Sequence, residues 1–264
     1  MRLKDNIRKL LRLAGYLLIA VLLGIVLGMI SMRESRVPCR AVTAHIPDSL
    51  DLGFVTGEEV KDLVLRSQGD ILGKPMKAIN TEKLEQDMMR HPYIREAQAY
   101  KDVEGVLHVE VLQRRPVVKI FLKSRKVIFI DDRGYLLPFS RKYPVHLLVA
   151  SGNISLPRGA GKYRSVEDIP AKNRLHDIFR MARYIGEHPF WKAQIEQIYV
   201  DRDGEYRLTP RVGSHAIILG DAEDFEKKLN NLYVFYTHAL NNLGWNIYTE
   251  INLKFKNQII CTRR

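Results

Sequence analysis

The carboxylate side chains with the spacing for catalysis or metal binding occur in short turn-like runs of this sequence. Asp201 and Asp203 precede Gly204 in the manner of a calcium-binding loop, but the later glutamate that such a loop requires is absent. Asp131 and Asp132 are adjacent like an acid pair, although Asp-Asp-Arg-Gly between two apolar runs is typical of a hairpin turn. The eight histidines do not occur at metal-ligand spacings. These residues therefore predict turns rather than reactive groups.

The sequence also lacks the motifs of several large enzyme classes. It contains no GxxxxGK[ST], G-x-S-x-G, S-x-x-K or H-E-x-x-H run, and its glycines do not cluster into a phosphate-binding loop. We therefore expect no enzyme activity, no catalytic residues, no bound metal and no cofactor. Function is then expected to lie in the surfaces of the protein.

An apolar run near the N-terminus has the length of a membrane span. No charged side chain occurs between Arg12 and Arg33. About twenty residues at roughly 1.5 Å each cover about 30 Å, the thickness of the hydrocarbon core. The run is apolar all round and is not followed by the small residues of a cleavage site. Residues 13–32 are therefore predicted to form an uncleaved transmembrane helix, followed by a linker over residues 33–39.

The charges that flank this run predict the orientation of the chain. The tail, residues 1–12, holds five Lys and Arg against Asp5 alone, and such an excess marks the cytoplasmic side. We expect a single-pass protein of the cytoplasmic membrane with its N-terminus inside and its C-terminus outside. Export permits a disulfide between Cys39 and Cys261, but two cysteines so far apart give no framework signal.

A strongly basic balance usually suggests an anionic partner. The chain of 264 residues carries a formal net charge of +12. An exported body does not meet the genome, so we expect no nucleic-acid binding and favour anionic lipid or an acidic protein. The densest stretch is either a solvated strand face or a patch for such a partner. It contains Arg114, Arg115, Lys119, Lys123, Arg125 and Lys126.

The hydrophobic pattern over residues 40–115 predicts a small α+β domain. A strand at 40–46 is followed by a capping box, Thr56 to Glu59, and a helix that Gly69 closes. A second helix is expected from Asn80 to 91. A run at 93–101, a turn, and a strand with Leu107, Val109 and Val111 on one face complete a strand–helix–helix–strand–strand order.

Beyond Pro116, the pattern predicts a mixed β domain with flanking helices over residues 116–264. Proline suits the start of a strand at this boundary. We expect helices at 173–187 and 224–241 and a polar loop at 151–170. The strands are expected at 117–122, 126–130, 135–137, 146–150, on both sides of 201–204, and at 215–219, 247–255 and 258–261.

Several segments, taken in order, resemble a known family. They are His91–Ala97, Val106–Val117, Ile128–Tyr135, Ile217–Leu229 and Ile251–Phe255. Together with the anchor, they resemble the bacterial cell-division protein family FtsQ, called DivIB in other bacteria. The chain carries Gln113 and Val118 where that family often has Glu and Ala. The likeness covers almost the whole chain.

This resemblance implies a POTRA domain followed by a β domain in a non-enzymatic scaffold at the division septum. It implies as partners the single-span proteins FtsB (DivIC) and FtsL, and through them the septal peptidoglycan synthase. The FtsB-type partner is expected to add a strand at the C-terminal edge of the sheet. The corresponding positions are Lys254, Phe255, Asn257, Gln258 and Ile259.

Two other functions compete with this one. A POTRA-bearing export or outer-membrane assembly factor usually carries several such modules or a β-barrel, and neither is visible in the sequence. A membrane-anchored envelope hydrolase is disfavoured by the missing nucleophile and metal motifs. A simpler role for Phe255 and Ile259 is to fill the core of the β domain.

Overall fold

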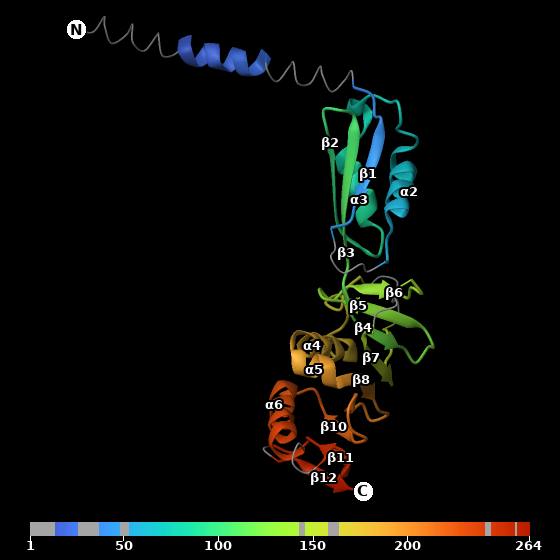
Figure 1. Ribbon diagram of the computed structural model, residues 1–264, viewed down its shortest axis with the longest axis vertical. Helices are drawn as coiled ribbons and strands as arrows, with labels where there is room; N and C mark the ends of the chain where they lie inside the picture. Colours follow the sequence, from blue (N-terminus) through green and yellow to red (C-terminus); the bar gives the residue numbers. More distant parts are fainter. Residues whose placement is uncertain are drawn as a thin grey trace, which may run out of the picture. The chain divides into compact units, whose positions relative to one another are not determined.

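The computed structural model describes residues 14–25, 37–47, 53–142, 146–157, 164–240, 244–256 and 258–264. The chain divides into two compact units (Figure 1). Unit 1 comprises Met1–Asp51 and Val55–Gln113, and unit 2 comprises Leu52–Phe54 and Arg114–Arg264.

Residues 14–25 are helical and fall within the apolar run near the N-terminus. Among the described residues, no helix has both the length and the apolar character needed to cross a membrane. The predicted span at 13–32 includes residue 13 and residues 26–32, which lie outside the described part of the chain. The predicted tail at 1–12 also lies outside it.

Unit 1 is a three-stranded sheet with two α-helices, in the order that the sequence predicts. The strand order is β1-β3-β2, with β1 parallel and β2 antiparallel to β3. The elements are β1 (Ala41–His45), α2 (Gly57–Gln68), the short 3-10 helix η1 (Met76–Ala78), α3 (Thr81–Met89), β2 (Ile94–Lys101) and β3 (Val106–Gln113).

Local sequence signals account for these elements. The hydroxyl of Thr56 accepts the backbone N–H of Glu59, and the Glu59 carboxylate accepts that of Thr56, so the predicted capping box is confirmed. Leu107, Val109 and Val111 of β3 are fully buried, as predicted. The short helix η1 was not predicted, because three residues carry no helical periodicity.

Unit 2 is built on a nine-stranded sheet in the order β12-β11-β10-β9-β8-β7-β4-β5-β6. Its strands are β4 (Pro116–Phe121), β5 (Val127–Asp131), β6 (Leu136–Pro138), β7 (Leu148–Gly152), β8 (Ile195–Val200), β9 (Tyr206–Pro210), β10 (Ala216–Gly220), β11 (Tyr248–Asn252) and β12 (Ile260–Arg263). Its helices are α4 (Arg174–Glu187), α5 (Pro189–Gln194), α6 (Phe225–Phe235) and the π-helical segment η3 (Tyr236–Leu240).

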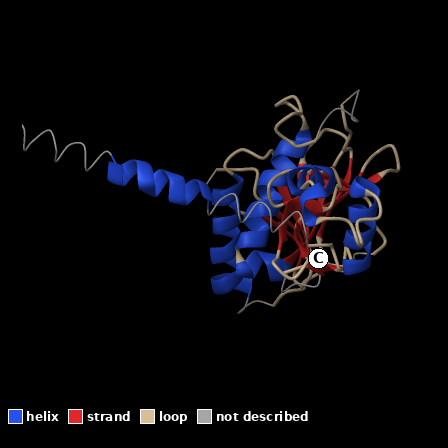
Figure 2. Cartoon of the chain, turned by 90° about the horizontal axis from the view of Figure 1, so that it is seen from above, coloured by secondary structure: helices blue, strands red, loops and turns tan. Residues whose placement is uncertain are grey.

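The helices of unit 2 serve as crossovers between parallel strands. β7 is parallel to β8, with α4 and α5 between them in the chain, and β10 is parallel to β11, with α6 between them. One buried cluster joins Leu175 and Trp191 of the first crossover to Phe225 of the second and to the strands. Figure 2 distinguishes these helices, in blue, from the red strands. The helices therefore share one hydrophobic core with the sheet.

Unit 2 departs from the predicted pattern at two places. The first predicted helix ends at Glu187 as expected, but Pro189 then starts α5, a short helix that the pattern did not predict. Proline suits the first turn of a helix because its missing N–H is not needed there. The strand predicted at 247–255 ends at Asn252, whose side chain accepts the N–H of Lys254 and turns the chain. Lys254 and Phe255 therefore lie in a turn.

Candidate functional site

The C-terminal strand β12 forms one edge of the nine-stranded sheet. It pairs with β11 in antiparallel register, with Ile251 opposite Cys261, and faces no further strand among the described residues. The N–H of Arg264 bonds to the carbonyl of Ile247, on the β11 side. Backbone groups alternate along a strand, so those of Cys261 and Arg263 point to the open edge. This confirms the prediction that the C-terminal pair of strands lies at a sheet edge.

The side chains of β12 and the residue before it divide between the two faces of the sheet. Ile259 and Cys261 are partly buried and pack against the hydrophobic core. Ile260, on the other face, is 46% exposed. Alternate side chains of an added strand would therefore lie on the core side of the sheet, and the others would lie on the solvent-exposed face.

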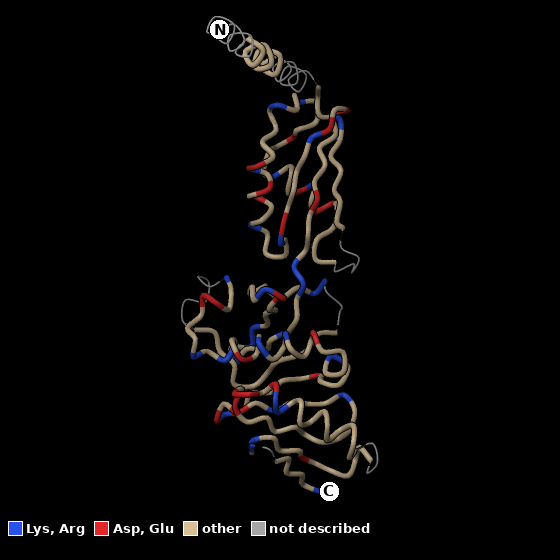
Figure 3. Tube along the Cα trace, turned by 90° about the vertical axis from the view of Figure 1, so that its left-hand side faces the viewer, with Lys and Arg blue, Asp and Glu red and all other residues tan. Residues whose placement is uncertain are grey.

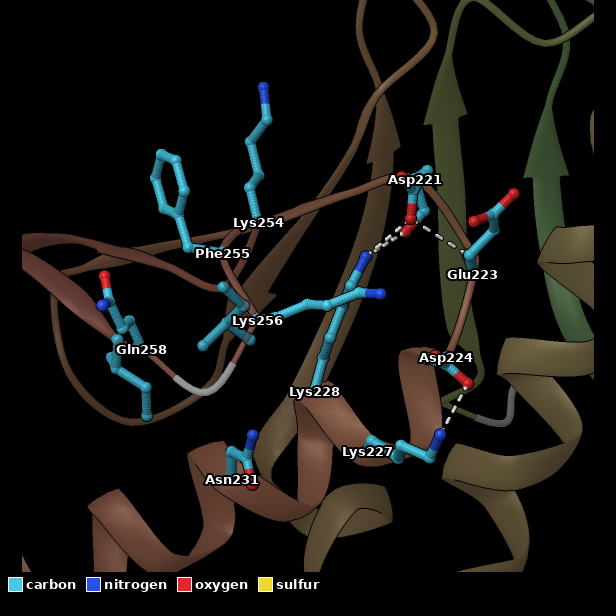
Figure 4. Close-up of a pocket in the computed structure, with 12 residues that line it drawn as sticks. Asp221, Glu223, Asp224, Lys227, Lys228, Asn231, Lys254, Phe255, Lys256 and Gln258 are labelled. Carbon is cyan, nitrogen blue, oxygen red and sulfur yellow. Dashed lines mark hydrogen bonds and ion pairs between the residues drawn. The ribbon is translucent and has the colours of Figure 1, made fainter.

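A cavity of about 310 Å³ lies beside the turn between β11 and β12. One wall is the turn that leads from β11 into β12, and the other is the β10–α6 loop with the first turns of α6 (Figure 4). Four of the predicted partner-binding residues, Lys254, Phe255, Gln258 and Ile259, line it. The fifth, Asn257, lies outside the described residues.

Lys228 fixes the wall that is formed by the β10–α6 loop. Its ammonium group lies 2.7 Å from a carboxylate oxygen of Asp221 and donates to the carbonyls of Leu219 and Asp221 at 3.1 and 3.0 Å. Its side chain is only 16% exposed. The hydrogen bond from Lys228 lowers the pKa of Asp221, so this carboxylate remains charged at neutral pH. This lysine is thus committed to holding the loop.

Lys254 is also engaged within the protein. Its ammonium group pairs with the carboxylate of Glu205, in the turn between β8 and β9. Its aliphatic stem crosses Gly220, where an added Cβ would lie 2.8 Å from the Lys254 Cγ. Gly220 has φ +78°, a conformation that favours glycine, so the residue suits both the turn and the close contact.

Phe255 is the exposed apolar side chain of this site. It is 50% exposed, and its carbonyl accepts the N–H of Gln258 at 3.3 Å in the β11–β12 turn. In Figure 4 its ring points away from Lys228 and Asn231 of α6. Core filling therefore does not account for Phe255, whereas Ile259 does pack on the core.

Sequence reasoning missed the helical wall of the site. Asp224 and Lys227 form an ion pair at 3.1 Å, and Asn231 lies farther along α6. Asp224 precedes the helix with φ 47°, which is unusual for a residue other than glycine. The only sequence signal was the likeness of the segment to a known family, which named no site residue there.

The other carboxylates that the sequence singled out serve turns. Asp201 accepts the N–H groups of Gly204 and Glu205, both at 2.9 Å, and Asp131 accepts those of Arg133 and Tyr135 at 3.0 and 2.7 Å. Both turn interpretations are confirmed. In the part of the chain that the structure describes, no three His, Cys, Asp or Glu side chains group as metal ligands.

Comparison with known proteins matches both units. Residues 37–112 match the POTRA-like domain, and residues 115–262 match the family described as FtsQ/DivIB, C-terminal related. The Cell division protein FtsQ of Rhodothermus marinus is 30% identical over 175 residues, which are 65% of this chain and 61% of that protein. The match thus spans less than two thirds of the relative. With a POTRA-like unit and a C-terminal unit that the family model covers almost to its end, the chain belongs to the FtsQ/DivIB family.

Proposed function

We propose that this protein is a non-enzymatic scaffold of bacterial cell division that recruits single-span division proteins at the cytoplasmic membrane. The observation that carries the proposal is the open edge of β12 beside a cavity rimmed by Phe255. The partner is of the FtsB (DivIC) type, with FtsL alongside it and the septal peptidoglycan synthase linked indirectly. Family membership and the name of the Rhodothermus relative support a role in division.

The partner adds a strand to the nine-stranded sheet. The N–H and C=O groups of Cys261 and Arg263 supply the new ladder, and each bond contributes about 0.5–1.5 kcal/mol. Burial of the exposed Phe255 ring adds about 1.5–3 kcal/mol. The main-chain hydrogen bonds supply affinity. Selectivity comes from the two faces of the sheet at this edge, which accept different side chains of the partner strand.

Residues 13–32 anchor the scaffold, with the tail 1–12 in the cytoplasm and the remainder outside at the septum. The uncharged run and the basic tail support this topology. A reporter that is active only outside the cytoplasm should work after Arg264 and fail after Arg12. Reversed activities would refute the orientation, and a mature N-terminus near residue 33 would show cleavage.

Proline at position 263 is the sharpest test of strand addition. Arg263 is exposed and its N–H points to the open edge, so proline removes a donor from the new ladder and leaves the bonds to β11 in place. Arg263→Pro should weaken binding of an FtsB-type partner by about tenfold, since about 1.4 kcal/mol is a factor of ten. Arg263→Ala keeps the N–H and is the matched control.

Binding titrations of the full chain should accompany melting curves of both variants. An Arg263→Pro variant that melts like wild type and binds like wild type would exclude this edge as the docking site. Position 259 is a poorer choice for proline, because Ile259 packs on the core and its loss disturbs the fold.

Phe255 can be tested against a second half-exposed phenylalanine at the other side of the sheet. Phe255→Ala should weaken partner binding by about tenfold or more. Phe121, which is 41% exposed on β4, provides the control, and Phe121→Ala should leave partner affinity unchanged. An equal loss of partner affinity in both variants would show that any exposed phenylalanine contributes, and it would exclude a specific role for Phe255.

A further inference from the structure

The positive charge of this protein is concentrated in one part of unit 2. Residues 114–166 contain twelve Lys and Arg and only two acidic residues, Asp131 and Asp132, in a chain whose net charge is +12. Asp131 is already paired with Arg114 at 2.9 Å. Figure 3 marks the basic positions in blue along the trace. This part of the sheet, β4-β5-β6, lies at the opposite edge from β12.

The turn between β4 and β5 presents several of these charges to solvent. Lys123, Arg125 and Lys126 are exposed, and no ion pair among the described residues involves them. The turn is fixed by two hydrogen bonds of 2.9 Å, from Arg125 N–H to the Leu122 carbonyl and from Leu122 N–H to the Lys126 carbonyl. We call residues 123–126 the basic tip.

Arg125 occupies a backbone conformation that glycine would adopt more easily. Its φ is +64°, and Asp224 is the other described residue besides glycine with positive φ. A side chain in this region is strained because its Cβ approaches the following carbonyl oxygen. The tip therefore keeps a third cation at the expense of turn stability, which is the kind of outlier from which a functional role can be inferred.

Exposed aromatic rings accompany the cations on the same part of the sheet. The Lys119 ammonium lies 5.1 Å from the ring centroid of Phe121 and 5.2 Å from that of Phe139. The two rings are 41% and 45% exposed. Aromatic rings next to Lys and Arg are the composition of surfaces that sit in the headgroup layer of a bilayer.

We propose that the basic tip, with Phe121 and Phe139, docks onto the anionic lipid headgroups of the membrane surface. Its cations project from the end of a hairpin, a shape that suits a flat charged layer. The cavity and the open strand edge that we propose for the protein partner lie at the far edge of the same sheet. Lipid docking at β4-β5-β6 leaves the β12 edge open for its partner.

The test uses the full chain in lipid nanodiscs with a fluorophore at the tip. Ser124→Cys carries the label in a Cys261→Ser background, and buried Cys39, whose pKa is raised by burial, remains unlabelled. The nanodiscs contain phosphatidylcholine alone or with phosphatidylglycerol, plus a lipid-borne quencher. We expect quenching with phosphatidylglycerol, background quenching without it, and loss of the effect at high salt.

The charge-neutral variant Lys123→Gln/Arg125→Gly/Lys126→Gln should retain its fold, because glycine relieves the strain at position 125. The variant should lower the association constant for the lipid surface by about one hundredfold. Each of the three cations that it removes contributes about 1 kcal/mol near an anionic surface. The control Lys192→Gln/Arg202→Gln/Arg211→Gln removes three exposed cations elsewhere in unit 2 and should leave quenching intact.

Equal quenching in both lipids, or equal loss in the control variant, would overturn the proposal. So would a tip that responds to an acidic polypeptide and not to phosphatidylglycerol, because the ligand would then be a protein. The anchor is assessed separately, by whether the chain remains with the nanodisc at all. Failure of docking is thereby distinguished from failure of the proposed topology.

Discussion

Arg114 places its guanidinium 2.9 Å from the fully buried carboxylate of Asp131 and 3.9 Å from the ring centroid of Tyr135. The arginine side chain is only 13% exposed. The pair joins the start of β4 to the end of β5, and the other Asp131 oxygen holds the following turn. Arg114, in the basic stretch at the start of unit 2, thus forms a structural ion pair. Its charge is therefore not available on the basic surface.

Arg114→Met should destabilise unit 2, because it leaves a buried carboxylate without its cation. Loss of one partner of a buried pair costs about 3–5 kcal/mol. Chemical denaturation of the full chain measures it. Arg183→Met is the control, because its pair with Glu187 has side chains 57% and 68% exposed and should contribute less than about 1 kcal/mol. A loss below 1 kcal/mol at Arg114 would contradict the structural role.

Val109→Ala should destabilise unit 1 by about 1–3 kcal/mol, through lost burial and the cavity that remains. Val109 is fully buried in β3, whereas Val103, in the β2–β3 turn, is 83% exposed. The same change at Val103 should shift the denaturation midpoint very little. Equal midpoints for the two variants would show that the inward face of β3 is wrongly assigned.

Gly220→Ala should disturb the partner site as well as the fold. The added Cβ would meet Lys254 at 2.8 Å, and alanine at φ +78° costs about 1–2 kcal/mol. We expect a lower melting temperature and weaker partner binding. Gly186→Ala in α4 has open space around its Cβ and should instead stabilise the helix by about 0.5–1 kcal/mol. Stabilisation at both positions would rule out the contact with Lys254.

His215 should make unit 2 sensitive to acid. Burial lowers its pKa, an effect that the Trp245 carbonyl partly offsets, and its Nε2 lies 2.6 Å from the Tyr236 hydroxyl. The folded-state pKa is below the ordinary value of 6.5, so stability is fully present above that pH. As the pH falls below it, the unfolded state binds a proton that the folded state resists, and stability decreases.

The corresponding measurement compares melting temperatures at neutral and mildly acidic pH. His215→Gln retains a hydrogen-bonding side chain without a titratable ring. Its melting temperature should therefore fall less on acidification than that of the wild type. Parallel decreases in both proteins would assign the acid sensitivity to other groups.

Short-range signals made unit 1 predictable from sequence. The capping box spans Thr56 to Glu59, and the alternation of Leu107, Val109 and Val111 fixes the buried face of β3. Such patterns depend on residues a few positions apart. The pairing of β1 with β3 joins residues more than sixty positions apart, so no local pattern predicts it.

The candidate site was only partly predictable for the same reason. Its turn could be located because the last two strands are adjacent in sequence. The opposite wall, with Asp221 and Lys228, is brought there by the parallel pairing of β10 and β11, which no local pattern encodes. The ion pair between Lys254 and Glu205 likewise joins residues 49 positions apart.

The order of strands in unit 2 has a consequence for local opening. β12 is held by one neighbouring strand, β11 by two, and strands nearer the centre are also covered by α4 and α5. Amide hydrogen exchange should therefore be faster in β12 than in β11 and slow progressively toward β8, since edge elements open without global unfolding. A strand bound at the edge would give β12 a second neighbour. Exchange in β12 should then slow, and the fastest exchange at this edge should occur in the bound strand of the partner.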